Sequence, residues 1–376
     1  MPSLIPFRAF ALFLGLIMPV ALQAATLLVG QVAPLTGLEG PQGRAYAAGI
    51  QLGLELANRD GSAGGHTFVL VSSDDGGRAA DTVSLTAALL RDKRPIALAG
   101  YFGGPNVAAL NDSGLLAKER IALVGYRSAD IRAEAPWMYN VRASLHDEIG
   151  KIVGHLATVG ASRIALVNEE GQSAAALIAA VGEATRKAGI RVVTQARIPA
   201  GTVKVGKAAQ TVAAQQPVAI IVIANAAATA SFIEHYRAIG GGAQIFAHSG
   251  ADLEQLIKQL AEEQMPGVSI AQVLPNPYKL NVPLVQQLQD AIRKSPQAQA
   301  LTPSYAMLEG FIAAKVIVEA ARRVGSRVTR ETLAAALENM QTYDLGGYMV
   351  SYRPDARGGS KYVELTIISK AGKIRQ

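Results

Sequence analysis

The chain has 376 residues, of which 50% are hydrophobic and 17% are charged, so we expect a globular protein of roughly two domains rather than a disordered chain. Its formal charge of +7 comes from Lys and Arg residues that are scattered without interleaved aromatics, which argues against nucleic-acid binding. Cysteine is absent, which excludes disulfides, thiolate metal sites, a cysteine nucleophile and a lipidated N-terminal cysteine.

Residues 1–25 have the pattern of a cleavable secretory signal peptide. A basic residue, Arg8, precedes an apolar run over residues 9–22, and small residues follow at Ala24 and Ala25. The run is shorter than the ~20 residues that a membrane-spanning helix needs. We therefore expect cleavage near Ala24 or Ala25 and a freely diffusing periplasmic protein.

Short apolar runs alternate with helical patterns from residue 26 onward. The first half contains the runs TLLVGQV, TFVLVSS, IALAG and IALVG, with helices expected over about 42–59, 78–92 and 107–119. The runs are almost continuously apolar rather than alternating, which is typical of parallel strands that are covered on both faces.

The second half repeats this alternation. Ser144 and Asp147 form a plausible capping box for a helix that runs to about residue 159. The runs RIALVN, RVVTQARI, VAIIVIAN, QIFAHS and GVSIAQVL then alternate with helices expected over about 172–187, 205–215, 227–239 and 253–264. Both halves follow a βαβαβ order, which predicts two doubly wound α/β lobes.

After PNPYK the pattern changes to three helices, expected over about 282–294, 304–324 and 330–339. Two strands follow, near GGYMVSY and KYVELTII. We expect these late segments to complete the two lobes rather than to form a third domain.

Motifs for chemistry are missing from the sequence. The first loop, APLTGLEGPQG, fits neither G-x-G-x-x-G nor a P-loop, so a nucleotide site is not indicated. The five histidines lack metal-ligand spacing, and no G-x-S-x-G elbow occurs. The adjacent acids Asp74 and Asp75 suit an acid/base pair or, more commonly, residues that cap a helix or hold a loop in place. We expect no catalysis and no cofactor.

The loops that follow the predicted strands favour a binding cleft, because ligands in open α/β sheets sit beyond the carboxyl ends of the strands. Small and hydroxyl-bearing residues at these ends leave backbone N–H groups free at helix starts, where they favour a carboxylate. Each loop alone suits an ordinary capped turn, whereas six loops on two lobes indicate a cleft. These loops are PLTGLEGPQG, AGYFGGPN, VGYRSAD, VNEEGQS, IANAAA and AHSGAD.

The order and spacing of several segments resemble the periplasmic solute-binding proteins of ABC importers, of the leucine/isoleucine/valine-binding type. These segments are GQVAPLTG, the glycines Gly43 and Gly49 before ELAN, SSDDGG, AGYFGG, RIALVN and PSYAMLEGFIAAKVIVEA. The resemblance implies the type I periplasmic binding protein fold, in which two lobes joined by three crossing segments close on a ligand by hinge motion. It places the first lobe at 26–143 plus about 275–344, and the second lobe at 144–274 plus about 345–376.

The resemblance also assigns ligand contacts in the first lobe. Gly103 and Gly104 lie in the loop that binds the ligand carboxylate, with only backbone donors at these two positions. In the next loop Tyr126 and Arg127 hold backbone-contact positions and Ser128 supplies a hydroxyl. Gln42 lies where the family often has an aromatic or polar contact.

In the second lobe the sequence departs from the family pattern. Ser173 and Asn225 stand where branched-chain amino acid binders have tyrosines, and Ser249 stands where they have the glutamate that pairs with the ligand ammonium. A hydrogen bond to a charged group contributes about 1.5–3 kcal/mol, so loss of this partner removes much of the affinity for a free amino acid. Arg127 could pair with an anionic group or point to solvent.

From these departures we hypothesise a small carboxylate ligand, such as an oxo- or aromatic acid, or an amide, with a branched-chain amino acid as the family default. The expected partners are this small ligand and a membrane permease, with the protein itself a monomer. A periplasmic sensor that presents its ligand-bound form to a receptor or regulator is the alternative. An enzyme is disfavoured, because no base–nucleophile arrangement is evident.

Overall fold

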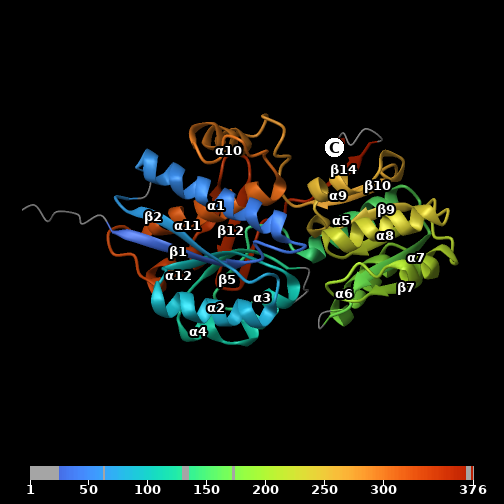
Figure 1. Ribbon diagram of the computed structural model, residues 1–376, viewed down its shortest axis with the longest axis horizontal. Helices are drawn as coiled ribbons and strands as arrows, with labels where there is room; N and C mark the ends of the chain where they lie inside the picture. The colour runs from blue at the N-terminus through green and yellow to red at the C-terminus, as the bar shows by residue number, and fades with distance from the viewer. Residues whose placement is uncertain (1–24, 62–63, 129–134, 172–173, 370–373, 376) are drawn as a thin grey trace, which may run out of the picture.

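The computed structural model describes residues 25–61, 64–128, 135–171, 174–369 and 374–375. Two α/β lobes lie side by side along the long axis of the molecule (Figure 1). Of the predicted signal peptide, residues 1–25, only Ala25 lies within the described residues. No helix in the described part of the chain has the length and apolar character needed to cross a bilayer.

The first lobe is built on a five-stranded sheet with the order β2-β1-β3-β4-β5, and all its pairings are parallel. The strands are β1 (Thr26–Ala33), β2 (Thr67–Asp74), β3 (Ala97–Phe102), β4 (Leu123–Arg127) and β5 (Met138–Tyr139). One face is covered by α1 (Gly40–Asp60) and α11 (Tyr305–Val324). The other face is covered by α2 (Ala79–Asp92), α3 (Gly104–Asp112) and α4 (Leu115–Lys118).

The long helices α1 and α11 pack at backbone contact because glycines occupy the crossing. A Cβ atom on Gly49 would lie 1.9 Å from the carbonyl oxygen of Met307, and one on Gly310 would lie 2.1 Å from that of Tyr46. Gly53 is similarly close to Ala314. The helix α11 is buried along most of its length, so this crossing forms the centre of the first-lobe core.

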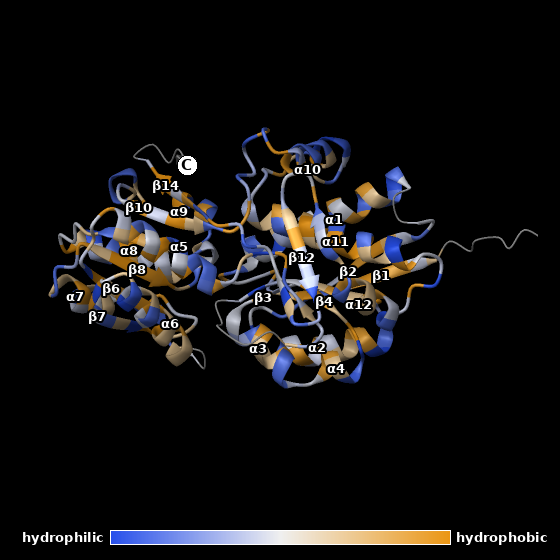
Figure 2. Ribbon diagram, turned by 180° about the vertical axis from the view of Figure 1, so that it is seen from behind, coloured by the Kyte–Doolittle hydropathy of each residue, from blue (hydrophilic) through white to orange (hydrophobic). Residues whose placement is uncertain are grey.

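The second lobe contains a seven-stranded sheet with the order β15-β14-β10-β9-β8-β6-β7. The strands β6 (Arg163–Glu169), β7 (Arg191–Ile198), β8 (Ala219–Ile223), β9 (Gln244–Ala247) and β10 (Val268–Gln272) pair in parallel. The strands β14 (Glu364–Ile368) and β15 (Ile374–Arg375) continue it antiparallel. Figure 2 shows mainly apolar residues along the central strands, as expected for strands covered on both faces.

Helices cover both faces of this second sheet. One face carries α5 (Leu145–Thr158) and α6 (Ala174–Lys187), and the other carries α7 (Gly206–Ala213), α8 (Ala226–Ala238) and α9 (Leu253–Gln259). The predicted capping box of α5 is confirmed, since the Ser144 side chain accepts from the Asp147 backbone N–H and the Asp147 carboxylate accepts from the Ser144 N–H. The predicted fold of two α/β lobes is therefore correct.

The last part of the chain differs from the prediction in where it changes lobes. After α10 (Pro283–Lys294), α11 and α12 (Arg330–Glu338), the strands β11 (Gln341–Asp344), β12 (Met349–Arg353) and β13 (Ala356–Gly359) form a separate three-stranded sheet. This sheet packs on the first lobe, where Tyr352 contacts Tyr139 edge-on. The chain enters the second lobe only at β14, so the predicted boundary at residue 344 is too early.

Two predicted helices are also shorter than expected. The helix expected over 107–119 is divided into α3 and α4 by Gly114, which has a left-handed φ of 69°. The helix expected over 253–264 ends at Gln259, and a short 3₁₀ turn (Glu262–Gln264) follows.

Candidate ligand-binding cleft

A cavity of about 860 Å³ lies between the two lobes. Its described lining comes from first-lobe segments at 34–39, 76–79 and 103–112, and from second-lobe segments at 169–171, 174–177, 200–201 and 223–225. These segments follow β1, β2 and β3 in one lobe and β6, β7 and β8 in the other. The cavity therefore sits beyond the carboxyl ends of the strands of both sheets, as the strand-end loops predict.

The first wall of the cavity is the β1–α1 loop, which Asp74 holds in place. One carboxylate oxygen of Asp74 accepts from the backbone N–H groups of Leu35 (2.9 Å) and Gly76 (2.9 Å), and the other accepts from the Thr36 hydroxyl (2.7 Å). These hydrogen bonds, led by that of Thr36, lower the pKa of Asp74 to about 2. Asp74 thus stays ionised and fixes the loop that approaches the second lobe.

The neighbouring Asp75 is buried and ties three elements together. Its carboxylate accepts from the Thr82 hydroxyl (2.6 Å) on α2, the Asn106 amide (3.1 Å) on α3 and the Gly77 backbone N–H (2.9 Å). The interpretation of the two acids as residues that hold loops in place is therefore confirmed. Both serve to position the cavity wall.

Gly103 and Gly104 lie at the cavity edge, at the start of α3. Gly103 has φ 98° and precedes the helix without a side-chain cap, and its own N–H donates to the Arg127 carbonyl oxygen (3.0 Å). Because Pro105 has no N–H, the uncapped donor at the helix start is the backbone N–H of Gly104. A Cβ atom built on Gly103 would lie 3.5 Å from a carboxylate oxygen of Glu39, which places that carboxylate beside the glycine loop.

The opposite wall is organised by Glu169, the last residue of β6, and Asn225, the residue that caps α8. Glu169 accepts from the Asn225 side-chain amide (2.7 Å) and backbone N–H (3.1 Å). Asn225 in turn accepts from the backbone N–H of Ala228 (2.9 Å). Asn225 therefore fixes both the helix start and the orientation of a carboxylate in the cavity lining.

The part of the cavity lining that the structure describes is acidic. It contains Glu39 and Asp112 from the first lobe and Glu169 and Glu170 from the second, and it contains no Lys or Arg among the described residues. Burial, and then the charge of Glu169, raise the pKa of Glu39 to about 7. Burial also raises the pKa of Glu169, although its hydrogen bonds to Asn225 and Gly201 oppose the change. The two lobes thus present desolvated carboxyl groups to one cavity.

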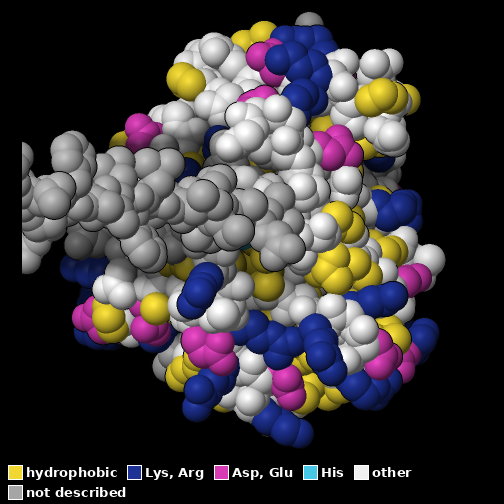
Figure 3. Space-filling model, turned by 90° about the vertical axis from the view of Figure 1, so that its left-hand side faces the viewer, with side chains coloured by type: hydrophobic (Ala, Val, Ile, Leu, Met, Phe, Trp, Pro, Cys, Tyr) yellow, Lys and Arg dark blue, Asp and Glu magenta, His cyan; other side chains and the backbone are white. Residues whose placement is uncertain are grey.

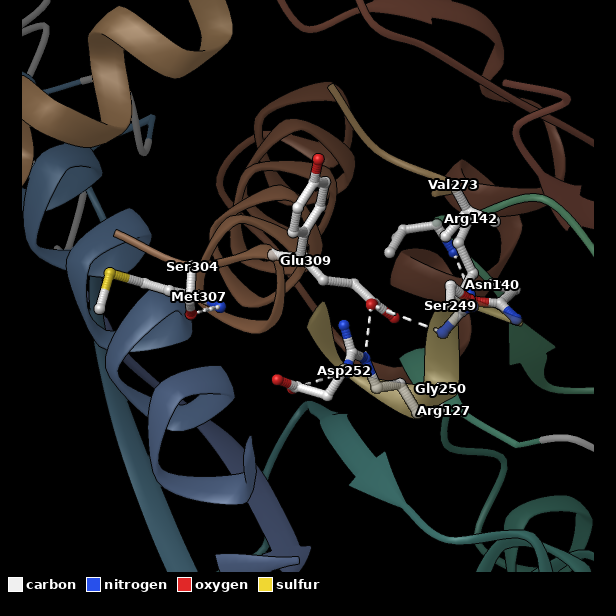
Figure 4. Close-up of polar contacts among 12 residues, drawn as sticks. Arg127, Asn140, Arg142, Ser249, Gly250, Asp252, Val273, Ser304, Met307 and Glu309 are labelled. Carbon is white, nitrogen blue, oxygen red and sulfur yellow. Dashed lines mark hydrogen bonds and ion pairs between the residues drawn. The ribbon is translucent and has the colours of Figure 1, made fainter. Parts of the chain in front are cut away.

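Arg127 lies outside this lining, in a buried charged cluster between the lobes (Figure 4). Its Nε atom is 2.7 Å from Glu309 on α11, its Nη1 atom is 3.9 Å from Asp252 at the start of α9, and its guanidinium stacks 5.7 Å from the Phe102 ring. Only 5% of Arg127 is exposed, so the alternative in which it points to solvent is wrong. Its charged partners are carboxylates of the protein itself, although its Nη1 atom makes no hydrogen bond to the described residues.

Ser249 belongs to the same cluster. Its hydroxyl (2.9 Å) and backbone N–H (2.7 Å) both donate to Glu148 of α5, and the Arg142 guanidinium contacts the hydroxyl. Arg142 also forms an ion pair with Glu148 (3.1 Å). Burial, and then Glu254, raise the pKa of Asp252 to about 7. Arg142 lies on the first crossing segment, so the cluster joins both lobes at the hinge.

The remaining predicted contacts are dispersed. Gln42 is buried within α1 and does not belong to the part of the cavity lining that the structure describes. Tyr126 and Ser128 are half-buried and do not belong to that lining either. Ser173 lies outside the described residues. Of the nine predicted ligand contacts, the structure brings Gly103, Gly104 and Asn225 to the cavity.

Glu39 and Glu169 were not predicted as site residues, although both lie in strand-end loops that the sequence pattern indicates. The signals that could have found them are an acidic residue directly before a helix, for Glu39, and one at the end of a strand, for Glu169. Two further loops line the cavity without having been predicted to do so: the β2–α2 loop at Gly76 and Gly77, and the β7–α7 loop at Gly201.

The sequence profile of the periplasmic binding protein family matches residues 26–372, nearly the entire described chain. The chain belongs to this family. Its members are binding proteins rather than enzymes, and they act outside the cytoplasm. Among curated proteins, no sequence matches this chain.

Solved structures of this family agree with the fold. A substrate-binding periplasmic protein from Ralstonia solanacearum is 34% identical, with a TM-score of 0.85 over 93% of this chain and 99% of that chain. A branched-chain amino acid ABC transporter protein from Thermus thermophilus with bound valine is 16% identical, with a TM-score of 0.81 over 94% and 95%. A fatty acid ABC transporter substrate-binding protein from Thermomonospora curvata is 19% identical, with a TM-score of 0.80 over 93% and 90%.

These last two proteins share the fold, although one is named for fatty acids and the other for branched-chain amino acids. The ligand is therefore decided by the residues of the cleft and not by the architecture. Within the described ranges, no group of three or more His, Asp or Glu side chains is placed to hold a metal ion.

Proposed function

We propose that this periplasmic binding protein is the solute-capturing subunit of an ABC importer. The observation that carries the proposal is the cavity of about 860 Å³ between the lobes, which is walled by strand-end loops from both sheets. A solute bound there contacts both walls at once, so its binding favours the closed arrangement of the lobes. The closed form then docks on a membrane permease pair.

We propose Gly103, Gly104 and Asn225 as ligand contacts within this cavity. Gly104 offers its backbone N–H group at the start of α3, whereas the N–H of Gly103 donates to the Arg127 carbonyl oxygen (3.0 Å), so that Gly103 contributes only its position at the cavity edge. Asn225 offers its amide beside Glu169. A bulky side chain at Gly104 would project toward the lining, where the nearest described atom to its Cβ is the Ser128 hydroxyl at 3.9 Å. Gly104→Val should therefore obstruct the cavity without disturbing the core.

The test combines small-angle scattering with thermal denaturation across a library of amino acids, amides, and aromatic and oxo-acids. A bound solute should reduce the radius of gyration and raise the melting temperature. Gly104→Val should abolish both effects, whereas Gly154→Val, on the open surface of α5, should preserve them. If no solute changes either measurement in the unmodified protein, the proposal is wrong. Capture of the closed form by the permease would separate import from sensing.

A further inference from the structure

Two carboxyl groups from opposite lobes face the same cavity. Glu39 precedes α1 in the first lobe, and Glu169 ends β6 in the second. We infer that the ligand carries a protonated amine, which Glu39 and Glu169 bind from the two sides of the cleft. This inference rests on the proposed function and specifies its ligand class.

The positions of the two carboxylates make them suitable as a pair. Glu169 is oriented by two hydrogen bonds from Asn225 and one from the Gly201 backbone, and it lines the cavity with part of its acceptor capacity unused. Glu39 lies against the Gly103 loop and makes no side-chain hydrogen bond to another described residue. An ammonium group has three donors, so it can bind both carboxylates and still bond a third acceptor.

The charge of the lining favours a cation over an anion. The lining that the structure describes holds four carboxyl groups and no basic side chain. The buried guanidinium groups of Arg127 and Arg142 lie outside it and form ion pairs with Glu309, Asp252 and Glu148. A carboxylate-only solute would meet like charge in a desolvated site. Closure without a cation would bring the carboxylates of the two lobes together, whereas an ammonium group between them removes this repulsion.

The titration of Glu39 predicts that ligand affinity depends on pH. The charged groups that act on Glu39 are Glu169 and Asp75, which raise its pKa, and Arg127, which lowers it. Because the pKa of Glu39 is about 7 in the ligand-free protein, part of the protein carries a protonated Glu39 at neutral pH. A cation binds the ionised form, so affinity should rise as the pH is increased from 6 to 7.5, with release of a proton.

The ligand also needs a counter-charge that Ser249 does not supply. In the family pattern that position carries a glutamate, whereas here Ser249 is hydrogen-bonded to Glu148 at the hinge. Glu39 and Glu169 provide the missing negative charge at a different place in the cleft. These two carboxylates favour an amine-bearing solute over the amine-free carboxylate that the sequence-based hypothesis proposed.

The experiment uses pairs of probes with the same carbon skeleton. The L-amino acids and putrescine are each tested beside the counterpart that has hydrogen or hydroxyl in place of the amine, by thermal shift and then by calorimetry. Only amine-bearing members should stabilise the protein. Glu39→Gln and Glu169→Gln should each weaken the best amine at least tenfold, and Glu39→Gln should remove the pH dependence. The control Glu183→Gln, on the exposed side of α6, should change neither.

Four outcomes would overturn the inference. An amine-free acid that binds as tightly as its amine shows that the ammonium is not recognised. Equal affinity of the amine for the unmodified protein and both Gln variants shows that these carboxylates do not hold it. Binding of some other solute, with no response to any amine, refutes the ligand class and leaves the proposed function intact. If every compound fails, both are wrong.

Discussion

Nε of Arg127 lies 2.7 Å from Oε2 of Glu309, and the two side chains are 5% and 0% exposed. They come from β4 and α11, which are separated by 182 residues of sequence. Arg142 also approaches Glu309, at 3.7 Å, so this carboxylate balances two buried guanidinium groups. The pair fixes the end of β4 against the central helix, next to the segment that crosses to the second lobe.

Glu309→Gln should therefore destabilise the protein strongly. Removal of one partner of a buried ion pair leaves the other charge uncompensated, and such changes lower the free energy of unfolding by about 3–5 kcal/mol. Because Gln keeps a hydrogen-bond acceptor, we expect a loss near the lower limit, measured by urea denaturation. Glu183→Gln breaks an exposed pair with Lys187 and should lower stability by only about 0–1 kcal/mol. Similar small losses for both variants would contradict the assignment.

Gly49→Ala tests the contact between α1 and α11. The added methyl group would lie 1.9 Å from the Met307 carbonyl oxygen, so the two helices must separate. Overpacking of this kind lowers stability by about 1–3 kcal/mol, and a backbone clash places the effect at or above the upper limit. Gly154→Ala, in the interior of α5 with no neighbouring atom within 4 Å, should instead raise stability by about 0.5–1 kcal/mol. Thermal denaturation of both variants should show a lower melting temperature for Gly49→Ala and a higher one for Gly154→Ala.

Asp74→Asn tests the support of the β1–α1 loop through its pH dependence. The pKa of Asp74 is about 2 in the folded protein, below its ordinary value of 3.8, so its ionisation favours folding above about pH 4. That contribution is lost as the pH falls from about 4 through 2. The variant should be less stable than the unmodified protein at pH 7, and the difference should shrink in acid. A difference that stays constant from pH 7 to pH 2 would exclude ionised Asp74 as its source.

Asn225→Ala separates the structural role of this residue from its proposed role in binding. Loss of the α8 cap should lower the free energy of unfolding by about 1 kcal/mol. It should also weaken solute binding, because Glu169 loses both its oriented amide donor and the cap that positions it. The matched control is Ser304→Ala, which removes the cap of α11, where the hydroxyl accepts from Met307. Calorimetry should show a comparable loss of stability but unchanged binding for this control.

Local sequence signals predicted the elements that position the site. The apolar runs located the strands, and the pair Ser144 and Asp147 located the start of α5. Since parallel strands end at one edge of a sheet, the loops after β1, β3, β6 and β8 were correctly expected to face a cleft. These features depend on residues that are close together in sequence.

The side-chain partners could not be predicted in the same way. Whether Arg127 meets solvent, a ligand or Glu309 depends on the packing of a helix that is distant in sequence. The position of Ser249 at the hinge depends likewise on Glu148 and Arg142, and a single sequence does not pair such positions. The late passage of the chain into the second lobe could not be predicted for the same reason. The position of β12 on the first lobe depends on contacts with Tyr139 and with the crossing segments, which are distant in sequence.

Those crossing segments are linked by one phenol group. The Tyr348 hydroxyl lies 2.9 Å from the Val141 carbonyl oxygen and 3.0 Å from that of Val273, on the first and second crossings. The surface at the far end of the first lobe, by contrast, carries Lys and Arg interspersed with Asp and Glu (Figure 3). The hinge is thus a defined polar structure, and the outer end is an ordinary solvated surface.

The passage of the chain into the second lobe at β14 has a practical consequence. The strand β1 belongs to one lobe and β14 to the other, at well-separated places in the molecule (Figure 1). A donor dye near Thr26 and an acceptor dye near Ile368 would therefore be attached to different lobes, and lobe closure would change the distance between them. Energy transfer between them would convert the protein into an optical reporter of its own solute.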